Sequence, residues 1–354
     1  MRNLGLDLLR ILAVFLVLGR HLRLPGEPSF LPTTWHRGGW IGVDLFFVLS
    51  GFLVSGLLFK EHLARGRVDI VRFLVRRGFK IYPSFWVLIA ATIGVALWRG
   101  KTISGRVLAG ELLFLQNYVG SLWGHTWSLA VEEHFYIGLA LLFPVLLSVR
   151  NGRGLNAIPR LFLLVAAACL TMRLLTMGYV ERYAHQRFLF PTHLRIDSLF
   201  FGVLLACLYH HRQLAERTRH VPAAVLVLAG VVLMAPPFAF SLSQHKWVSV
   251  LGVIPVYMGS GLLLLAAVRV ERSSNRLLLG LGALGATSYP IYLWHMAVNY
   301  WGCELLDTVV GFHWFELYAV LYFAGSCAVG YTLSKAVEWP LLRLRDRLFP
   351  RAER

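Results

Sequence analysis

An arginine and a histidine stand eleven residues apart in one apolar stretch, "RILAVFLVLGRH", which runs from Arg10 to His21. In a continuous α-helix, eleven steps of ~100° make three turns plus only about 20°, so the two side chains lie on one stripe. The same helix separates them by roughly 16 Å along its axis. Because a charge that faces lipid is costly, this stripe must face protein or a water-filled cavity.

Three further apolar segments also carry ionisable residues. The segments are "GGWIGVDLFFVLSGFL", "HTWSLAVEEHFY" and "THLRIDSLFFG", and their ionisable residues include Asp44, Glu132, Arg195 and Asp197. With the orientation argued below, these residues and His21 lie at one level in the outer leaflet. An imidazole with carboxylates nearby can take a proton from a hydroxyl, because its pKa is suited to that work.

Basic residues stand at the opposite, cytoplasmic side, where we expect Arg10, Arg77 and Lys80. Their guanidinium and ammonium groups suit a phosphate-bearing cytosolic ligand, held by bidentate and point-charge contacts. A ligand that reaches from this level to His21 has to be long. A coenzyme with a phosphorylated head and a thin pantetheine arm ending in a thioester has about this shape.

Each of these residues also has a purely structural interpretation. Arg10 can snorkel toward the cytoplasm and pair with Asp7, three residues before it. His21 can be an interfacial histidine, and Asp44 and Glu132 can be ion-pair partners of Arg195. The basic residues of segment 60–80 can form an amphipathic surface helix that binds lipid headgroups. The structural interpretations explain least well why four helices carry ionisable groups at one level.

The composition indicates the class of protein that holds these residues. The 354 residues are 57% hydrophobic and only 15% charged, with a mean hydropathy of +0.62. Such values are typical of an all-α polytopic membrane protein. We expect about ten transmembrane helices, near residues 4–23, 40–59, 82–98, 127–149, 158–178, 192–210, 221–242, 247–268, 283–305 and 314–336. Segment 107–122 is apolar but short, and we expect it to be re-entrant or interfacial.

The positive charges set the orientation of these helices. The second loop, "KEHLARGRVDIVRFLVRRGFK", contains seven Lys or Arg residues, and alternate loops after it are also basic. By the positive-inside rule, both termini are cytoplasmic. We attribute the net charge of +17 to cytoplasmic loops that meet anionic lipid, and not to nucleic acid. The cysteines do not have the spacing of metal ligands, so we expect neither a zinc site nor a disulfide. They are Cys169, Cys207, Cys303 and Cys327.

These motifs resemble the hallmarks of the integral-membrane acyltransferase-3 family of polysaccharide and glycolipid O-acyltransferases. "RILAVFLVLGRH" is similar to the family's Arg-x10-His helix, "GVDLFFVLSGFL" to its second block, and "RRGFKIYPSFW" to its basic RxxR block. "WSLAVEEHFY" resembles the WSLxxE block, and "SYPIYLWH" resembles a late helix of the family. The blocks extend over most of the chain. We expect one transmembrane acyltransferase domain over residues 1–340 and a short basic cytoplasmic tail over residues 341–354.

The sequence also departs from the family pattern. The basic block has Lys80 at its second position, where an arginine would bind phosphate bidentately. His134 stands where glutamine is common, and neither it nor His295 has an assigned role. Many members carry a C-terminal SGNH hydrolase-like domain, which we do not expect in this chain. One enzyme would then perform the whole transfer, or a separate partner would finish it.

The resemblance implies a multi-pass enzyme of the bacterial inner membrane, which moves an acyl group, commonly acetyl from acetyl-CoA, onto a hydroxyl of a surface polysaccharide or lipid-linked sugar. His21 would act as general base or as a covalent acyl carrier, and Asp44 or Glu132 would orient its imidazole. The residues expected to bind the donor are Arg10, Ser50, Gly51, Arg77 and Lys80. Those expected to bind the acceptor are Trp127, Arg195 and Asp197. No metal is expected.

Two other functions fit the same residues. A transporter or flippase for a lipid-linked sugar also needs intramembrane charges and access from both sides of the membrane, but it would not consume a thioester. A non-catalytic partner in polysaccharide assembly would show no turnover at all. The expected partners are the carbohydrate acceptor, membrane lipids, and either a second copy of the chain or polysaccharide-assembly proteins, but no nucleic acid.

The orientation leads to a first testable prediction. Single cysteines introduced at Gly105 and Arg67 of a cysteine-free variant should react with a membrane-impermeant thiol reagent from opposite sides, Gly105 from outside. The cysteine-free protein serves as the control for background labelling. Labelling of both positions from the same side would contradict ten spans in this orientation.

Overall fold

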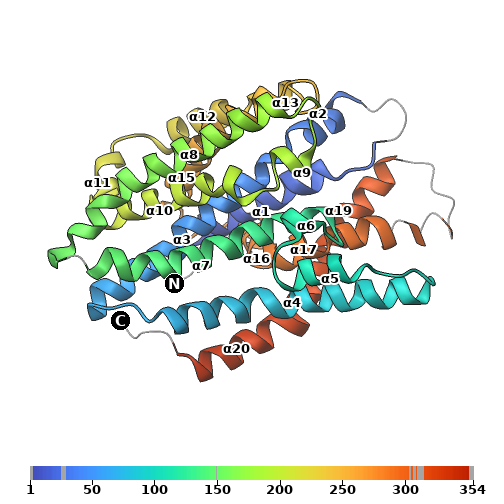
Figure 1. Cartoon of the computed structure of the whole chain (residues 1–354), viewed down its shortest axis with the longest axis horizontal. Helices are drawn as coiled ribbons and strands as arrows, with labels where there is room; N and C mark the ends of the chain where they lie inside the picture. Colours follow the sequence, from blue (N-terminus) through green and yellow to red (C-terminus); the bar gives the residue numbers. More distant parts are fainter. Residues whose placement is uncertain are drawn as a thin grey trace. The chain divides into compact units, whose positions relative to one another are not determined.

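The structure, a computed structural model, describes residues 3–24, 29–148, 150–302, 304–305, 308 and 315–350. Over these residues the chain is helical and contains no strand, as expected (Figure 1). It divides into two compact units that alternate along the sequence. The first unit comprises Met1–Gly42, Val75–Ser104 and Val270–Arg351, and the second comprises Val43–Leu74, Gly105–Arg269 and Ala352–Arg354. Cys303 and residues 351–354 of the expected tail lie outside the described residues.

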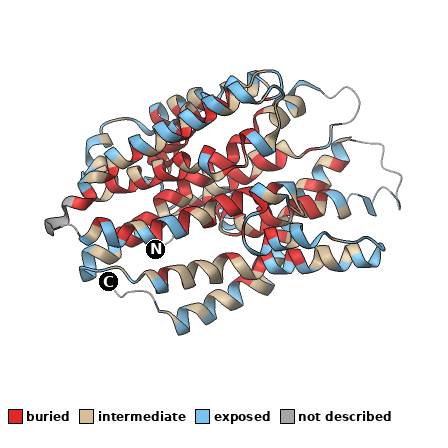
Figure 2. Cartoon of the chain, viewed as in Figure 1, coloured by how far each residue is buried: buried red, intermediate tan, exposed pale blue. Residues whose placement is uncertain are grey.

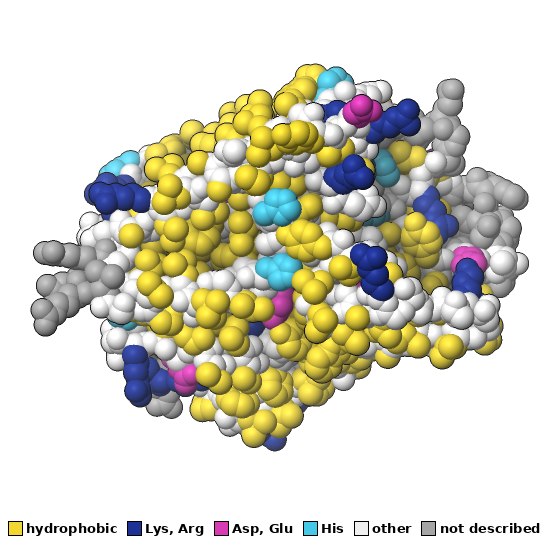
Figure 3. All heavy atoms as spheres, in the orientation of Figure 1, with side chains coloured by type: hydrophobic (Ala, Val, Ile, Leu, Met, Phe, Trp, Pro, Cys, Tyr) yellow, Lys and Arg dark blue, Asp and Glu magenta, His cyan; other side chains and the backbone are white. Residues whose placement is uncertain are grey.

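Several of the described helices are long and apolar enough to cross a membrane. By length and composition they are Ile41–Arg65, Ile70–Trp98, Gly124–Ser148, Gly154–Tyr179 and Phe315–Leu348. A sixth candidate is the pair Arg276–Ala286 and Ser288–Gly302, which is bent by 70° at its break. Hydrophobic side chains cover much of the helix surface in Figure 3, as contact with lipid requires. The helices fit a polytopic membrane protein, while the number of ten spans and the side of the termini stay predictions.

The first unit is built around α1 (Leu4–Arg20). Its other elements are α2 (Phe30–Gly38), most of α4 (Ile70–Trp98), α16 (Arg276–Ala286), α17 (Ser288–Ala297), the π-helical η4 (Val298–Gly302), α19 (Phe315–Leu333), the π-helical η5 (Ser334–Glu338) and α20 (Trp339–Leu348). The side chain of Asn3 caps α1 by accepting a hydrogen bond from the backbone N–H of Leu6 at 3.0 Å. Because α1 ends at Arg20, His21 is its C-cap residue and the helix is shorter than the expected 4–23.

The second unit is built around α3, α7 and α10, where buried residues concentrate (Figure 2). Its elements are α3 (Ile41–Arg65), α5 (Gly105–Leu112), α6 (Gln116–Val119), η1 (Gly124–Thr126), α7 (Trp127–Ser148), η2 (Arg150–Ala157), α8 (Ile158–Tyr179), α9 (His185–Phe188), η3 (Thr192–Leu194), α10 (Ile196–His211), α11 (Leu214–Thr218), α12 (Ala223–Met234), α13 (Pro236–Ala239), α14 (Trp247–Val250) and α15 (Val253–Ala267). Segment 107–122 forms the short α5 and α6, and neither has the length of a span.

Two glycines mark the closest approach of α3 to α10. A Cβ atom at Gly51 would lie 2.0 Å from the carbonyl oxygen of Leu199, and one at Gly202 would lie 2.4 Å from the carbonyl oxygen of Val48. The two backbones therefore touch, as small residues allow in membrane helix packing. This contact gives Gly51, which we expected at the donor site, a structural role in the second unit.

The close approach predicts that Gly51→Ala destabilises the protein. The added methyl group would meet backbone and not a side chain that can turn away, and overpacking of this kind costs about 1–3 kcal/mol. Gly138→Ala in α7 is the matched control, because a Cβ atom there meets nothing within 4 Å and alanine favours a helix. Thermal unfolding in detergent measures both variants. Equal Tm values would contradict the contact.

Candidate active site

The expected site residues divide between the two units. The proposed base and three donor-binding residues, His21, Arg10, Arg77 and Lys80, belong to the first unit. The others, Asp44, Ser50, Gly51, Glu132, Trp127, Arg195 and Asp197, belong to the second.

His21 lies at the end of α1, beside a second histidine of the first unit. Its Nδ1 is 3.0 Å from the carbonyl oxygen of Val17 and 3.2 Å from Nε2 of His295 on α17. The two ring centroids are 4.9 Å apart, and the ring planes are inclined by 54°. His295 is completely buried, whereas His21 is half-buried. The imidazole of His21 is therefore held by protein groups, while the residue as a whole stays partly exposed.

A chain of hydrogen bonds fixes the backbone at His21. Asn299 of η4 donates from Nδ2 to the carbonyl oxygen of His21 at 2.6 Å. The hydroxyl of Tyr318 donates to Oδ1 of Asn299 at 2.9 Å, and the backbone N–H of Arg23 donates to that hydroxyl at 3.0 Å. Neither Asn299 nor Tyr318 was predicted from the sequence to lie at the site. A π-helical segment such as η4 is frequent at functional sites, but its presence is not visible in the sequence.

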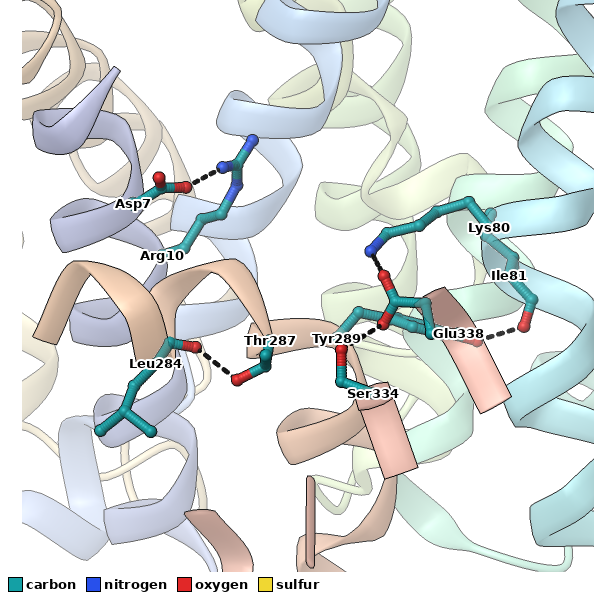
Figure 4. Close-up of polar contacts among 9 residues, drawn as sticks. All are labelled: Asp7, Arg10, Lys80, Ile81, Leu284, Thr287, Tyr289, Ser334 and Glu338. Atoms are coloured by element: carbon teal, nitrogen blue, oxygen red, sulfur yellow. Dashed lines mark hydrogen bonds and ion pairs between the residues drawn. The ribbon is translucent and has the colours of Figure 1, made fainter. Parts of the chain in front are cut away.

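The donor-side cations of the first unit lie beside carboxylates (Figure 4). Arg10 forms an ion pair with the buried Asp7, which is the structural alternative considered above. Lys80 of α4 forms an ion pair with Glu338 of η5, which is only 2% exposed. The hydroxyl of Ser334 also donates to Glu338, at 3.3 Å. The side chains of Arg10 and Lys80 each remain 30% exposed, so both cations are still within reach of a ligand.

The ring of Tyr289 lies beside Lys80 and is itself bonded to the next residue of α4. Its Nζ lies 5.9 Å from the centroid of the Tyr289 ring, and the Tyr289 hydroxyl donates to the carbonyl oxygen of Ile81 at 2.7 Å (Figure 4). Arg77 precedes Lys80 by three residues on α4 and is half-buried. Glu338 was not predicted to lie at the site, because its only signal in the sequence is an acidic residue near the end of an apolar segment.

The second unit contains a buried group of four charges. Nη2 of Arg195 lies 2.6 Å from Oδ1 of Asp44, and the hydroxyl of Ser198 donates to the same oxygen at 2.9 Å. Arg173 of α8 forms an ion pair with Asp197 of α10. All four charged side chains are at most 1% exposed. The two ion pairs are electrically balanced and connect α3, α8 and α10, an arrangement that favours a structural role for Asp44, Arg195 and Asp197.

Glu132 has different surroundings from Asp44. It accepts hydrogen bonds from the hydroxyl of Ser50 at 2.7 Å and from the hydroxyl of Tyr136 at 3.3 Å. The second block and the WSLxxE block thus meet at Ser50 and Glu132. The guanidinium carbon of Arg195 lies 5.7 Å from the centroid of the Trp127 ring. The ring of Phe190 stacks on the Trp127 ring, with 5.1 Å between the two centroids.

A buried carboxyl group that was not predicted from the sequence lies in α5. Glu111 is only 1% exposed and accepts hydrogen bonds from the backbone N–H of Leu122 at 2.7 Å and from the hydroxyl of Thr126 at 3.1 Å. Burial raises the pKa of Glu111 to about 7, against the hydrogen bonds, which lower it. Both protonation states are therefore populated near neutral pH. Among the described residues, no group of three or more His, Cys, Asp or Glu side chains could hold a metal ion.

These features define a helical membrane protein that holds an imidazole, cations and carboxylates inside its units, the class to which the acyltransferase motifs point. A family model described as "Acyltransferase domain" matches residues 3–335, and the chain belongs to this family, acyltransferase-3. The resemblance seen in the sequence motifs is thereby confirmed.

The relatives carry acetyl-transfer names. Peptidoglycan O-acetyltransferase OatA of Listeria monocytogenes is 26% identical over 318 residues, covering 83% of this chain and 49% of the relative. O-acetyltransferase OatA of Staphylococcus aureus is 25% identical over 318 residues, covering 83% and 50%. A protein of S. aureus strain COL, provisionally named an O-acetyltransferase, is 26% identical over 321 residues, covering 83% and 50%. The chain spans about half the length of the curated relatives it matches. No solved structure matches it significantly.

The ion pair between Asp44 and Arg195 leads to a stability prediction. Arg195→Gln should lower the free energy of unfolding by roughly 3–5 kcal/mol, because it leaves Asp44 buried and uncompensated. Arg99→Gln is the control, since the pair of Arg99 with Glu304, at 3.1 Å, is 32% and 52% exposed and such pairs contribute about 0–1 kcal/mol. The double variant Asp44→Asn with Arg195→Gln should regain part of the loss. Equal effects of Arg195→Gln and Arg99→Gln on thermal unfolding would contradict a buried pair.

Proposed function

We propose that the protein transfers an acyl group, commonly acetyl, from a cytosolic acyl-CoA to a hydroxyl of a surface polysaccharide or lipid-linked sugar at the bacterial inner membrane. The setting of His21 carries this proposal, because its imidazole lies in a polar network within a chain of the acyltransferase family. The carbohydrate acceptor is supported by a relative named for O-acetylation of peptidoglycan.

His21 acts as the general base in the proposed reaction. Its imidazole accepts the proton of the acceptor hydroxyl while the hydroxyl oxygen attacks the thioester carbonyl carbon. The C–S bond then breaks, and the thiolate of coenzyme A takes up a proton from the imidazolium. In the covalent variant the imidazole attacks the thioester first, and the hydroxyl then accepts the acyl group from nitrogen. Both routes form one ester and one free thiol.

The cations of the first unit bind the phosphates of the donor in this proposal. Arg10 and Lys80 are partly exposed and lie beside the carboxylates of Asp7 and Glu338. Phosphate oxygens would bind these cations beside the carboxylates or in their place. Arg77, on the same face of α4 as Lys80, would add a bidentate contact to phosphate. A carboxylate next to each cation also keeps the site close to neutral before the donor arrives.

Glu132 and Ser50 are the residues of the second unit that we propose for the active site. Their direct hydrogen bond joins two of the family's motifs, and Glu132 also accepts a hydrogen bond from the hydroxyl of Tyr136. Asp44, Arg195 and Asp197 would instead hold the helices that carry them. The ring of Trp127 would help to bind the acceptor in this proposal.

The function is tested by comparing His21→Ala with Arg77→Ala. His21→Ala should lower acyl transfer by at least the ~10²–10⁴-fold of general-base catalysis while it preserves binding of coenzyme A. Arg77→Ala should weaken binding of coenzyme A by roughly 10- to 150-fold, which corresponds to the loss of one charge-assisted contact of ~1.5–3 kcal/mol. The assay measures acetylated product and coenzyme A binding on monodisperse protein in detergent.

Two results would contradict the proposal. Near-normal turnover by His21→Ala would make the histidine a bystander. Transport of a lipid-linked sugar by purified protein without consumption of the thioester would favour the transporter.

A further inference from the structure

We propose that His295 is a positioning residue, which holds His21 in the tautomer with the proton on Nδ1 and so presents Nε2 as the reactive nitrogen. The inference rests on the proposed function, in which His21 is the base. His295 is the last residue of the motif "SYPIYLWH", and the motif itself does not indicate a role for it.

The direction of the hydrogen bonds at His295 follows from a backbone contact. Nδ1 of His295 is hydrogen-bonded to the carbonyl oxygen of Tyr292, one turn earlier in α17. A carbonyl oxygen can only accept, so Nδ1 must carry the proton. A neutral imidazole carries one N–H, and Nε2 of His295 is therefore an acceptor that faces His21.

The same reasoning determines the tautomer of His21. Its Nδ1 faces two acceptors, the carbonyl oxygen of Val17 at 3.0 Å and Nε2 of His295 at 3.2 Å. Each contact requires a proton on Nδ1, and the two requirements agree. If Nε2 of His295 donated instead, a lone pair of His21 would point at the carbonyl oxygen of Val17. The Val17 contact thus decides the direction, and the lone pair of His21 resides on Nε2.

This arrangement has a consequence for both routes of acyl transfer. Nε2 is the nitrogen that takes the proton from the acceptor hydroxyl or attacks the thioester, and it points away from both partners. Once Nε2 is protonated, the bond from Nδ1 of His21 to His295 becomes charge-assisted and therefore stronger. Asn299 restrains the same residue through its backbone carbonyl, so the ring is fixed in position as well as in tautomer.

The test compares His295→Leu with His295→Gln. Leucine fills space but accepts no hydrogen bond, whereas the glutamine side chain can place an oxygen near the position of Nε2. His220→Leu, at an exposed position of the second unit, is the matched control. Two quantities are measured on full-length protein: the tautomer of His21 by ¹⁵N NMR of histidine-labelled protein, assigned by difference from His21→Ala, and kcat and KM for acetyl-CoA.

The expected results separate positioning from simple packing. In the unsubstituted protein and in His220→Leu, the His21 signals should be those of the Nδ1–H tautomer. His295→Leu should mix the tautomers and lower kcat by roughly 10- to 100-fold with KM for acetyl-CoA unchanged, as for other groups that orient a functional histidine. His295→Gln should restore most of both properties. Unchanged thermal unfolding shows that the variants are folded.

Several results would overturn the inference. An Nε2–H tautomer of His21 in the unsubstituted protein would do so without any variant, even if His295→Leu does not fold. An unchanged tautomer and kcat in His295→Leu would do so as well. Failure of the proposed function is distinct, because it appears as turnover by His21→Ala, while the NMR measurement needs no turnover.

Discussion

The cost of taking a charge out of water governs the polar interior of this protein. A charge in an apolar interior is tolerated only with a partner, and little water reaches the interior of a helical membrane protein to serve as one. In the second unit, Asp44 with Arg195 and Arg173 with Asp197 meet this constraint because each buried charge is paired with one of opposite sign. In the first unit, the buried Glu338 is neutralised by a cation that stays partly exposed. The two kinds of pair differ in exposure: the fully buried pairs connect helices, whereas Arg10 and Lys80 stay 30% exposed, as the ligand-binding role proposed for them requires.

The same constraint separates residues that looked equivalent in the sequence. Asp44 and Glu132 both stand in apolar segments within family motifs, but Asp44 neutralises Arg195, whereas Glu132 accepts hydrogen bonds from two hydroxyl groups. A carboxylate that accepts hydrogen bonds from hydroxyl groups can change partners at lower cost than one that compensates a buried guanidinium. The neighbours of a titratable group, more than its motif, therefore indicate which carboxylate can take part in chemistry.

Much of the architecture could be predicted because it depends on composition and local spacing. Long apolar segments indicate membrane helices, and the possible pairing of Arg10 with Asp7 is visible because the two residues are three positions apart. Contacts between distant segments could not be predicted in this way. His21 and His295 are 274 residues apart, and their contact depends on the rotation and approach of α1 and α17. The pairing of Lys80 with Glu338 across 258 residues was missed for the same reason.

Two of the polar partners that were missed, Asn299 and Glu338, lie in the π-helical segments η4 and η5. A π-helical turn holds an extra residue compared with an α-helical one. Because this wider turn takes up the extra residue, the helix after it faces nearly as it would without that residue, whereas deletion of one residue from an α-helical part would turn every later side chain by about 100°. The late helices of this protein are therefore constrained in length as well as in composition. They can accept many exchanges of one apolar residue for another, but loss of one α-helical position before η4 or η5 would turn Asn299 or Glu338 away from its partner while leaving the hydropathy of the helix almost unchanged.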